Sequence, residues 1–463
     1  MSDPALSSIA TVEDVVRLIQ ARRPDHVNVG YGDMPGQLRV KYVSTERFLS
    51  ALDKGIGFAG AALALDHGDV QRPAQGVSSG DGVIFGDRLC RIVPDSVREI
   101  PWESPTRNLL FLADFEEPEG PLQPRNVYRR VLARARAQGL RAFHSSEYEF
   151  TMFEETPRSV REKDYRGLRL ATLDNSYHLM LRQGVGSGFY NALMDCCKRM
   201  DIPLEGVHEE MGAGFMEAAL AYGEGVRAAD DAMLFKTVAK IVAQRHDKLI
   251  TFMARWSNQA DGQSGHIHVS LRDEQGDPVF HDPSEPRGMS RTMRHFVGGV
   301  QRLLPEFLIL FGPTVNSFRR YQPWIFSPVA ATWGWENRTC ALRLIGGSPH
   351  SQRVECRVPG ADANPYLALA CVLGAGLWGI EQAIEPGEES TWNVYENLDK
   401  VAPHYRFPRS FAAAIERFDA SRAARELFGD RFVDAYVEMK RAQDEEFAAL
   451  VTDVELRRFF EFA

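Results

Sequence analysis

The stretch "RVECRVPGADANPYLALA", residues 353–370, joins a charged strand to a buried helix and decides the fold. Arg353, Glu355 and Arg357 alternate with apolar residues, which is typical of a β-strand with three charged side chains on one face. Asn364 followed by proline is the pattern of a helix cap and first turn, and the apolar run after it predicts a buried helix. The stretch therefore predicts a strand with a charged face followed directly by a core helix.

The charged face of this strand has two interpretations. A carboxylate between two guanidinium groups is either a structural ion-pair ladder or a ligand set for an anion and a metal ion. The segment "ENRTCALR" (336–343) adds Arg338 and Arg343, and Arg320 lies nearby in the chain. Because the formal net charge is -9, this local cluster of arginines predicts anionic ligands, for which a nucleoside triphosphate is a natural candidate.

A pair of acids stands in "SEYEF" (146–150). On a strand, Glu147 and Glu149 share one face, whereas Tyr148 and Phe150 face the opposite side and the core. Two carboxylates side by side repel each other. The pair therefore indicates either a bound cation or two acids that face open water.

The segment "HEEMGAGFMEA" (208–218) supplies further acids, Glu209, Glu210 and Glu217. Its glycines disfavour a helix, so we expect a loop to carry these carboxylates. The alternative to a metal-binding role is a solvated acidic loop.

A pair of imidazoles stands in "SGHIHVS" (264–270), with His266 and His268 on one face of a predicted strand. No cysteine accompanies them, and acids are abundant. Carboxylate oxygens with one imidazole suit Mg²⁺ or Mn²⁺ better than Zn²⁺.

Composition limits the protein classes that remain. The chain has 463 residues, 44% hydrophobic and 25% charged, which is typical of a soluble globular protein with more than one domain. Its acidic balance argues against a nucleic-acid partner. The N-terminus does not resemble a signal peptide, the longest apolar run is too short for a membrane span, and the six scattered cysteines suggest no disulfide framework. We therefore expect a cytoplasmic protein without a membrane or nucleic-acid partner.

The first part of the chain reads mostly as strand. Residues 11–22 predict a helix capped by Thr11, and 26–33, 37–44 and 82–93 alternate like strands. The proline-broken segment 98–108 predicts a boundary, which places a first domain at 1–107 and a second at 108–463.

The second part alternates strands and helices, and ends in a charged helical region. The predicted strands begin at Leu140, at Gly265, at Cys340 and at Arg353, and a long helix is expected over 225–248. The run "GVGSGF" (184–189) fits no phosphate-binding fingerprint and is interpreted as a flexible turn.

Five motifs together resemble one known family. In order and spacing, "EYEF", "HEEMGAGFME", "SGHIHVSL", "ENRTCALRL" and "RVECRVPGADANPYLALA" resemble the type I glutamine synthetase family. The segment "GDRLCRIVPDSVREIPW" (86–102) resembles the end of the small N-terminal domain of that family. The resemblance covers nearly the whole chain.

The resemblance implies an α+β fold with an N-terminal β-grasp domain and a catalytic domain whose curved antiparallel sheet forms a funnel. It implies a homo-oligomer of rings, a dodecamer of two stacked hexamers, in which the small domain of one subunit closes the funnel of the next. The implied partners are small molecules: glutamate, an amine and ATP.

The resemblance also implies roles for individual residues. One metal site would use Glu149, Glu210 and Glu217, and a second would use Glu147, His266 and Glu355, for two to three Mg²⁺ or Mn²⁺ ions per site. The substrate glutamate would contact Arg320, Arg357 and Gly262. The phosphates would face Arg338, Arg343 and Arg353, and the nucleotide side would be lined by His268 and Ser270.

The implied reaction joins two anions and then forms an amide. Phosphoryl transfer from ATP to the γ-carboxylate of glutamate would give γ-glutamyl phosphate, and metals and arginines would lower the repulsion. An amine would then displace phosphate, in a funnel that keeps water away from the reactive intermediate.

Two positions depart from the family pattern. Ala59 in "GFAGAAL" stands where the family has an aspartate of the ammonium site, and Phe326 in "RRYQPWIFSP" stands where it has a glutamate. An ammonium ion would lose its hydration in such a pocket without a carboxylate in return. Trp324 and Phe326 therefore read as a flap that lines an amine pocket rather than as core.

The double replacement predicts a γ-glutamylamide synthetase whose acceptor is a monoamine with an apolar body, either an alkylamine or an arylamine. The alternatives are a glutamine synthetase that uses ammonium, and an enzyme for polyamines or ethanolamine. A third, an inactive ring-forming homologue, is disfavoured because all six metal-ligand positions keep Glu or His. Asp261 and His350 also depart from the family pattern, and Tyr395 resembles a tyrosine that some members adenylylate.

Overall fold

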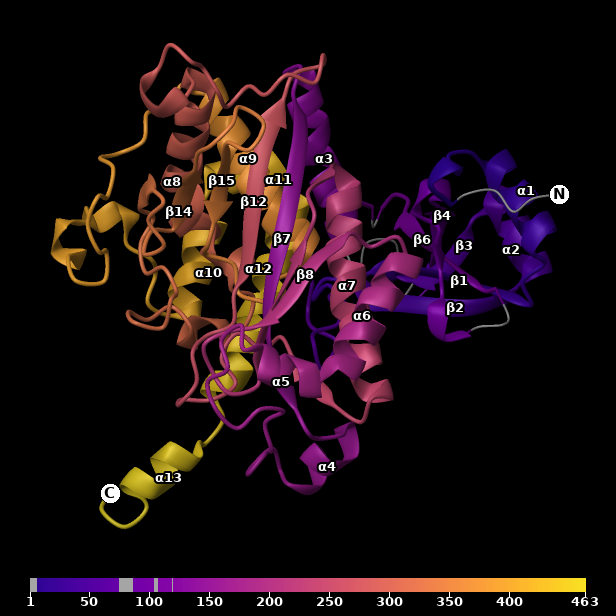
Figure 1. The fold of residues 1–463 in the computed structure, drawn as a ribbon, viewed down its shortest axis with the longest axis horizontal. Helices are drawn as coiled ribbons and strands as arrows, with labels where there is room; N and C mark the ends of the chain where they lie inside the picture. The colour runs from indigo at the N-terminus through magenta and orange to yellow at the C-terminus, as the bar shows by residue number, and fades with distance from the viewer. Residues whose placement is uncertain (1–5, 75–85, 104–106, 119) are drawn as a thin grey trace.

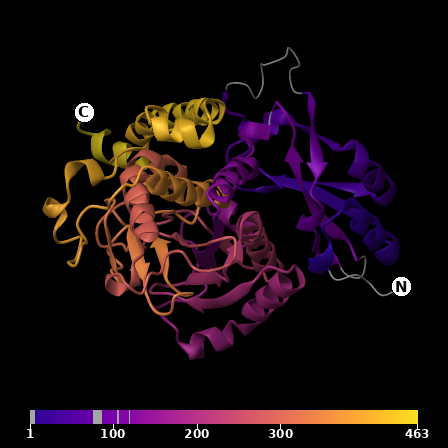
Figure 2. The ribbon, with the colours of Figure 1, turned by 90° about the horizontal axis from the view of Figure 1, so that it is seen from above.

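The computed structural model describes residues 6–74, 86–103, 107–118 and 120–463. Two sheets organise the molecule: an N-terminal sheet (indigo to violet in Figure 1) and a larger one that is covered by helices. Seen from above, the N-terminal sheet and its helices form a separate unit beside the larger body (Figure 2).

The N-terminal sheet has six strands within the described residues, in the order β2-β1-β6-β4-β3, and β5 pairs with β6. β1 runs antiparallel to β2 and parallel to β6. Phe48 of α2 packs against Phe111 of β6, with ring centroids 4.9 Å apart. The elements are α1 (Val12–Arg22), β1 (His26–Gly32), β2 (Leu38–Ser44), α2 (Thr45–Lys54), β3 (Ile56–Ala59), β4 (Asp87–Ile92), β5 (Arg98–Glu99) and β6 (Leu109–Phe115).

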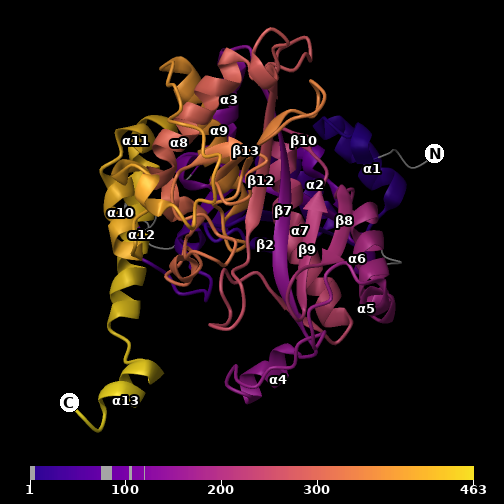
Figure 3. The ribbon, with the colours of Figure 1, turned by 60° about the vertical axis from the view of Figure 1, so that its left-hand side comes forward.

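The larger sheet has nine strands in the part of the chain that the structure describes, and β7 is its long central strand (Figure 3). The path runs β13-β14-β15-β12-β7-β9-β8, and β10 and β11 both pair with β7. The strands are β7 (Arg141–Phe153), β8 (Leu204–Glu209), β9 (Phe215–Leu220), β10 (Gly223–Glu224), β11 (Leu249–Thr251), β12 (Gly265–Arg272), β13 (Trp333–Trp335), β14 (Leu342–Ile345) and β15 (Arg353–Cys356).

Helices α3, α7 and α9 pack against the larger sheet and bury one of its faces. Tyr148 of β7 stacks on Phe235 of α7, and Phe150 is fully buried, as the alternation of β7 predicts. α9 is buried along nearly its whole length, and Asn364 caps it by accepting hydrogen bonds from the backbone N–H groups of Tyr366 and Leu367. The opposite face of the sheet carries the polar residues singled out above.

The helices outside the N-terminal unit are α3 (Pro124–Ala137), α4 (Pro157–Glu162), α5 (Met180–Val185), α6 (Ser187–Arg199), α7 (Val226–Arg245), α8 (Arg291–Phe311), α9 (Pro365–Glu381), α10 (Phe411–Asp419), α11 (Arg422–Phe428), α12 (Asp430–Ala448) and α13 (Asp453–Phe459). The last of them, α13, projects away from the body (Figure 1).

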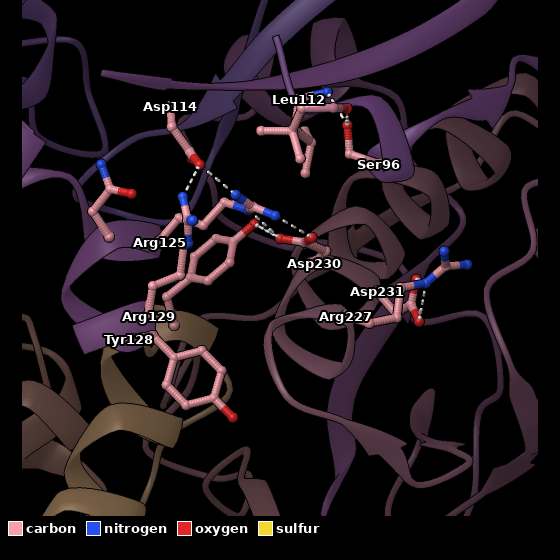
Figure 4. A network of polar contacts seen from close by, with 12 residues as sticks. Ser96, Leu112, Asp114, Arg125, Tyr128, Arg129, Arg227, Asp230 and Asp231 are labelled. Carbon is pink, nitrogen blue, oxygen red and sulfur yellow. Dashed lines mark hydrogen bonds and ion pairs between the residues drawn. The ribbon is translucent and has the colours of Figure 1, made fainter. Parts of the chain in front are cut away.

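A buried ion network joins the N-terminal sheet to the helices of the second part (Figure 4). Arg125 of α3 donates to Asp114 of β6 at 2.7 Å and to Asp230 of α7 at 2.8 Å. Tyr366 of α9 donates to the same Asp230 carboxylate at 2.7 Å. Because burying an unpaired charge is costly, these mutual bonds fix β6 against α3 and α7.

The α+β fold, with an N-terminal β domain and a catalytic domain, is confirmed, with local corrections to the prediction. The run 184–189 is not a flexible turn, because α5 ends at Val185 and α6 begins at Ser187. The larger sheet is antiparallel except for the parallel pair β13–β14. Part of the predicted strand 82–93 lies outside the described residues. The division 1–107 and 108–463 stays a prediction, and the first sheet continues to Phe115.

Candidate active site

The strand register brings the predicted polar residues into rows across the larger sheet. Directly opposed residues of neighbouring strands share a face, with their side chains in contact range. His266 lies opposite Glu147, and His268 lies opposite Glu355. Glu149 lies opposite Glu217 in the same way. Four strands, β9, β7, β12 and β15, therefore supply one continuous polar face.

Glu147 is the centre of this polar face. Its Oε1 lies 3.0 Å from Nε2 of His268, and its Oε2 lies 3.3 Å from Nδ1 of His266. Burial favours the neutral carboxyl, but the bonds to the two imidazoles outweigh it and lower the pKa of Glu147. Glu147 is therefore an ionised carboxylate held between two imidazoles.

Glu355 links the imidazoles to the arginines. Its Oε1 lies 3.7 Å from Nδ1 of His266 and accepts a hydrogen bond from Arg357. Its Oε2 accepts one from Arg343 at 3.0 Å. Burial opposes ionisation of Glu355, but the charge of Arg357 and the imidazoles keep its pKa lowered. The alternation of Arg353, Glu355 and Arg357 thus produces a mixed site rather than an isolated ion-pair ladder.

A second group of acids comes from the hairpin β8–β9. The sequence predicts a loop here, and this prediction is wrong for two of the three acids. Glu209 is the last residue of β8 and Glu217 lies within β9, whereas Glu210 follows β8. Burial and the charges of Glu147, Glu149 and Glu210 raise the pKa of Glu217 to about 9. Negative charge is therefore crowded here without enough positive charge to balance it.

The residues present fit a hard divalent cation. Carboxylate oxygens with an imidazole are the ligands that Mg²⁺ and Mn²⁺ use. Nε2 of His266 is buried and has no hydrogen-bond partner among the described residues. An added cation would satisfy this nitrogen and favour the ionised form of Glu217.

The groupings of potential ligands differ from those that the resemblance implies. Within the described residues, ligand atoms lie within 4.8 Å of one another in the sets Glu147–His268–Glu355, Glu147–Glu217–His266 and His178–His208–Glu210. Glu147 thus belongs to two sets, and His268, expected on the nucleotide side, is itself a potential ligand in one of them. The two predicted ligand sets stay predictions.

Glu209 holds a loop rather than lining the polar face. It is buried and accepts hydrogen bonds from Ser176 and from Tyr190 at 3.1 Å. Its backbone carbonyl accepts one from the N–H of His178. This anchoring places the His178 ring 4.6 Å from that of His208, beside Glu210. The sequence carries no pattern that would single out His178.

A cavity of about 280 Å³ adjoins this polar face. Five residues singled out from the sequence line it: Glu147, His268, Ser270, His350 and Arg353. Nε of Arg353 donates to Nδ1 of His268 at 3.3 Å. His268, Ser270 and Arg353 therefore lie together beside Glu147, whereas Arg343 is not among the lining residues, and the nucleotide site stays a prediction.

Other residues line this cavity that no sequence motif singled out, among them Glu205, Tyr222 and Arg272. The guanidinium of Arg272 lies over the rings of Phe143 and Tyr222, at 4.5 and 5.9 Å. The alternation of "GHIHVSLRD" contained the signal for Arg272, because residues 266, 268, 270 and 272 share one face.

The remaining arginines occupy contrasting positions. Arg338 is exposed on the turn after β13. Arg343 is bonded to both Glu336 and Glu355. Arg320 is only 1% exposed, and its N–H groups donate to Ser264 Oγ and to the carbonyls of Val358 and Arg357. Arg320 thus faces protein oxygens, and its contact with glutamate stays a prediction.

Gly262 lies directly against the Arg320 side chain. A Cβ at this position would come within 2.5 Å of Cγ of Arg320. The two residues expected to hold glutamate are therefore neighbours, and the close approach requires glycine.

The flap residues are not part of the core. Trp324 and Phe326 are 61% and 58% exposed, and both have positive φ, 69° and 54°. The Trp324 ring lies 5.8 Å from that of Tyr395, whose buried hydroxyl has no hydrogen-bond partner among the described residues. Exposed aromatic rings on a backbone with left-handed residues are typical of a surface that meets a ligand or a partner.

Ala59 ends β3 in the N-terminal sheet, with an exposed side chain. Its opposed residue in the β3–β4 ladder is Asp87, so the carboxylate of Asp87 lies on the same face. A Cβ at Gly57 would come within 2.9 Å of Oδ2 of Asp87. The absence of an acid at position 59 is therefore accompanied by an acid directly across the ladder, which the sequence alone does not reveal.

The chain was compared with known proteins. Residues 121–459 match the family model described as glutamine synthetase, catalytic domain. The γ-glutamylethanolamide synthetase GlnA4 of Streptomyces coelicolor is 35% identical over 454 residues, covering 97% of this chain and 96% of that protein. The glutamate–isopropylamine ligase of a Pseudomonas species is 30% identical over 479 residues, covering 100% of both chains.

A solved structure supports the same assignment. The structure described as apo GmaS without ligand superposes with a TM-score of 0.83, at 25% identity, over 96% of this chain and 98% of that one. Among the described residues, no helix is both long and apolar enough to cross a membrane. With five ordered motifs, a matching family model and full-length relatives in agreement, the chain belongs to the glutamine synthetase family of ATP-dependent glutamate ligases.

Proposed function

We propose that this protein joins the γ-carboxylate of L-glutamate to an organic amine, with ATP as the energy source, and releases a γ-glutamylamide, ADP and phosphate. The observation that carries the proposal is the aromatic, acid-free flap of Trp324 and Phe326 in a chain that otherwise retains the polar face of a glutamate ligase. The acceptor is a monoamine with an apolar body, an alkylamine or an arylamine.

The first step transfers a phosphoryl group. A γ-carboxylate oxygen of glutamate attacks the γ-phosphorus of ATP, the bond to the β–γ bridging oxygen breaks, and ADP leaves. Arg338, Arg343 and Arg353 are the cations assigned to the phosphates. Arg353 lines the cavity beside His268 and Ser270, which supports the binding of ATP there.

Six residues would hold the divalent cations: Glu147, Glu149, Glu210, Glu217, His266 and Glu355. Bound Mg²⁺ or Mn²⁺ ions would screen the phosphate oxygens and stabilise the charge that develops during transfer. The raised pKa of Glu217 supports this assignment, because the metal-free site is short of positive charge.

Arg320, Arg357 and Gly262 are assigned to the substrate glutamate. Arg357 lies beside Glu355, so a carboxylate bound there would be close to the polar face. Arg320 would have to exchange a carbonyl or hydroxyl partner for the substrate carboxylate.

The second step forms the amide. The amine nitrogen attacks the carbonyl carbon of γ-glutamyl phosphate, phosphate leaves, and the nitrogen loses a proton. An arylamine is already neutral at pH 7 and needs no base to deprotonate it before attack. Trp324 and Phe326 offer apolar surface to such a body, and Ala59 would join them from a neighbouring subunit.

A second candidate function, a glutamine synthetase that uses ammonium, gains support from Asp87. Its carboxylate lies across the ladder from Ala59 and would attract a cationic nitrogen. The same carboxylate would serve a polyamine or ethanolamine.

The proposed assembly is a ring-forming homo-oligomer in the cytoplasm. An exposed apolar segment at the C-terminal end supports assembly with other copies of the chain, because such surface is usually covered by a partner. Its residues are Leu450, Val451, Val454, Leu456, Phe459, Phe460 and Phe462.

The identity of the acceptor is tested with a variant that restores the two acids of the family pattern. The double variant Ala59→Asp with Phe326→Glu is compared with the wild type in glutamate-dependent phosphate release, using ammonium, isopropylamine and aniline as acceptors. We expect the double variant to gain on ammonium and lose on the apolar amines, each by about tenfold in kcat/KM, or about 1.4 kcal/mol.

The control variant is Ala62→Ser, which adds a polar group near position 59 without a charge. The proposal would be contradicted if ammonium were the best acceptor of the wild type and if kcat/KM were the same in the double variant. That result would favour a glutamine synthetase.

A further inference from the structure

A cavity of about 600 Å³ lies where the N-terminal sheet meets the catalytic domain, and no candidate site residue lines it. Its walls come from the β1–β2 turn, His67, α7, residues 251–253, the segment 314–316, Asp362 and the end of α12. The volume is that of an ordinary small-molecule pocket. The cavity is therefore a second place on this chain where a ligand fits.

The cavity is lined by cations. Lys236 and Lys240 lie four residues apart on α7 and so share one helix face. Nζ of Lys236 donates to the carbonyl of Ala363 at 3.0 Å, and no carboxylate of the described chain pairs with either ammonium group. Burial and the charge of Lys240 lower the pKa of Lys236 to about 7, and the charge of Asp362 offsets only part of this shift.

Other residues nearby reinforce this positive charge. Lys440 is buried, and its Nζ donates to the carbonyl of Pro313 at 2.7 Å. Asp362 is the acid among the lining residues, and its Oδ2 accepts from Ser317 at 2.6 Å and from Thr314 at 3.1 Å. Its Oδ1 is buried without a hydrogen-bond partner among the described residues. Two lining lysines against this one carboxylate leave net positive charge, so the cavity favours a ligand that brings negative charge.

The cavity also offers apolar surface. The Phe252 ring lies 5.6 Å from Nζ of Lys236 and 5.7 Å from Nζ of Lys240. Phe447 of α12 also lines the cavity. A ligand with an apolar body and one anionic group would match both kinds of surface.

The cavity is lined by segment 314–316, which precedes the flap residues Trp324 and Phe326 in the chain. Asn316 lines the cavity and exchanges two hydrogen bonds with the backbone of Arg255. Arg255 in turn donates to the carbonyl of Arg319 at 2.9 Å, immediately before Arg320 and the flap. Two hydrogen-bonded steps, Asn316 to Arg255 and Arg255 to Arg319, therefore connect the cavity to the segment that carries Trp324 and Phe326.

We propose that this cavity binds a small organic anion, a carboxylate or a phosphate with an apolar body, and that the bound anion stabilises segment 314–319. The site is separate from the ligase reaction, so its occupancy would act on the flap from outside the active site. Neither part of the inference depends on which amine the enzyme uses.

Calorimetric titration at low ionic strength tests the binding, with benzoate and phenyl phosphate as probes. Lys240→Gln removes an exposed lining charge, Lys240→Arg keeps it, and Lys54→Gln removes an exposed charge on α2 as the matched control. We expect Lys240→Gln to weaken binding of at least one probe by about tenfold, whereas the other two variants bind as the wild type does. Equal binding by Lys240→Gln and wild type, or no binding of either probe by the wild type, would overturn the inference.

Hydrogen–deuterium exchange tests the link to the flap without any catalytic assay. The bound probe is expected to slow amide exchange in 314–319 in the wild type and in Lys54→Gln, but not in Lys240→Gln. Unchanged exchange in this segment with the probe bound would overturn the proposed effect on the flap.

Discussion

Glu217 is a carboxyl group whose ionisation is strongly opposed by its surroundings. Its pKa is raised to about 9 in the folded protein, from an ordinary value of 4.5. The folded state therefore holds a proton that the unfolded state releases between these pH values. In metal-free protein, the free energy of unfolding should fall as pH rises from 4.5 to 9, by up to about 1.4 kcal/mol per pH unit.

Urea unfolding in EDTA at pH 6, 7 and 8 measures this slope. Glu217→Gln should flatten it, whereas the control Glu46→Gln, an exposed site on α2, should leave it unchanged. Added Mg²⁺ should stabilise the wild type more at pH 8 than at pH 6, since it binds the ionised carboxylate. A stability that rises with pH in EDTA, and that Glu217→Gln does not alter, would contradict this account of the site.

Asp87 lies opposite Ala59 in the β3–β4 ladder and would add negative charge to the proposed acceptor pocket. If its carboxylate meets the acceptor from a neighbouring subunit, Asp87→Asn should lower kcat/KM by about tenfold for amines that are cationic in solution. An arylamine, being neutral, should be used as well as before. The control is Asp53→Asn, an exposed acid of the same domain. Equal losses with isopropylamine and aniline would show that Asp87 acts through the fold instead.

Single residues were predictable where periodicity placed them. The two-residue repeat of strands puts Glu147, Glu149, His266 and His268 on one face, and the structure has them there. The position of Asp87 opposite Ala59 depends on how β3 and β4 pair, which no local pattern specifies. The place of His178 depends on bonds from its loop to Glu209, so its sequence neighbours carry no signal for it.

At the scale of elements, the backbones of α8 and α9 approach each other closely where the two helices cross. A Cβ at Gly379 would lie 2.3 Å from the carbonyl oxygen of His295 and 2.5 Å from Cα of Gly299. We expect Gly379→Ala to destabilise the protein by about 1–3 kcal/mol, because two helix backbones would have to separate.

The same helix supplies a matched control. A Cβ at Gly374 would meet only the side chains of Leu427 and Val131, at 3.4 and 3.5 Å. Gly374→Ala should therefore be neutral or stabilising by up to about 1 kcal/mol, as helix propensity predicts. Thermal unfolding of the two variants measures the difference, and equal midpoints would argue against the close crossing.

Elements with strong local signals were predicted well. Thr11 caps α1, Asn364 caps α9, and β7 spans the alternating segment 141–153. The hairpin β8–β9 was expected as a loop because Gly212 and Gly214 dominate its sequence, yet they only form its turn. The parallel pairs β1–β6 and β13–β14 join strands distant in sequence or separated by a turn, and such pairing is set by tertiary packing.

At the scale of the whole molecule, the exposed apolar segment at 450–463 predicts assembly. Its side chains would remain in water in an isolated chain, and burial against another copy would remove that cost. Deleting 450–463 should reduce the sedimenting mass from a ring to a smaller species. Substituting the exposed Arg457 and Arg458 by Gln serves as the control and should leave the mass unchanged. A truncated chain that sediments as the wild type does would place the contact elsewhere.

The proposed ring assembly would determine whether Ala59 and Phe326 meet. Ala59 lies in the N-terminal sheet and Phe326 in the flap of the catalytic domain. In the proposed pocket they come from two subunits, and residues from a second subunit cannot be derived from local sequence patterns.

The central claim is that an organic amine, rather than ammonium, accepts the γ-glutamyl group. A competition measures it most directly: the enzyme receives ATP, Mg²⁺, glutamate, and equal concentrations of ammonium, isopropylamine and aniline in one reaction. Mass spectrometry then gives the ratio of γ-glutamylamides to glutamine. The account predicts at least about tenfold more γ-glutamylamide than glutamine, whereas glutamine as the main product would contradict it.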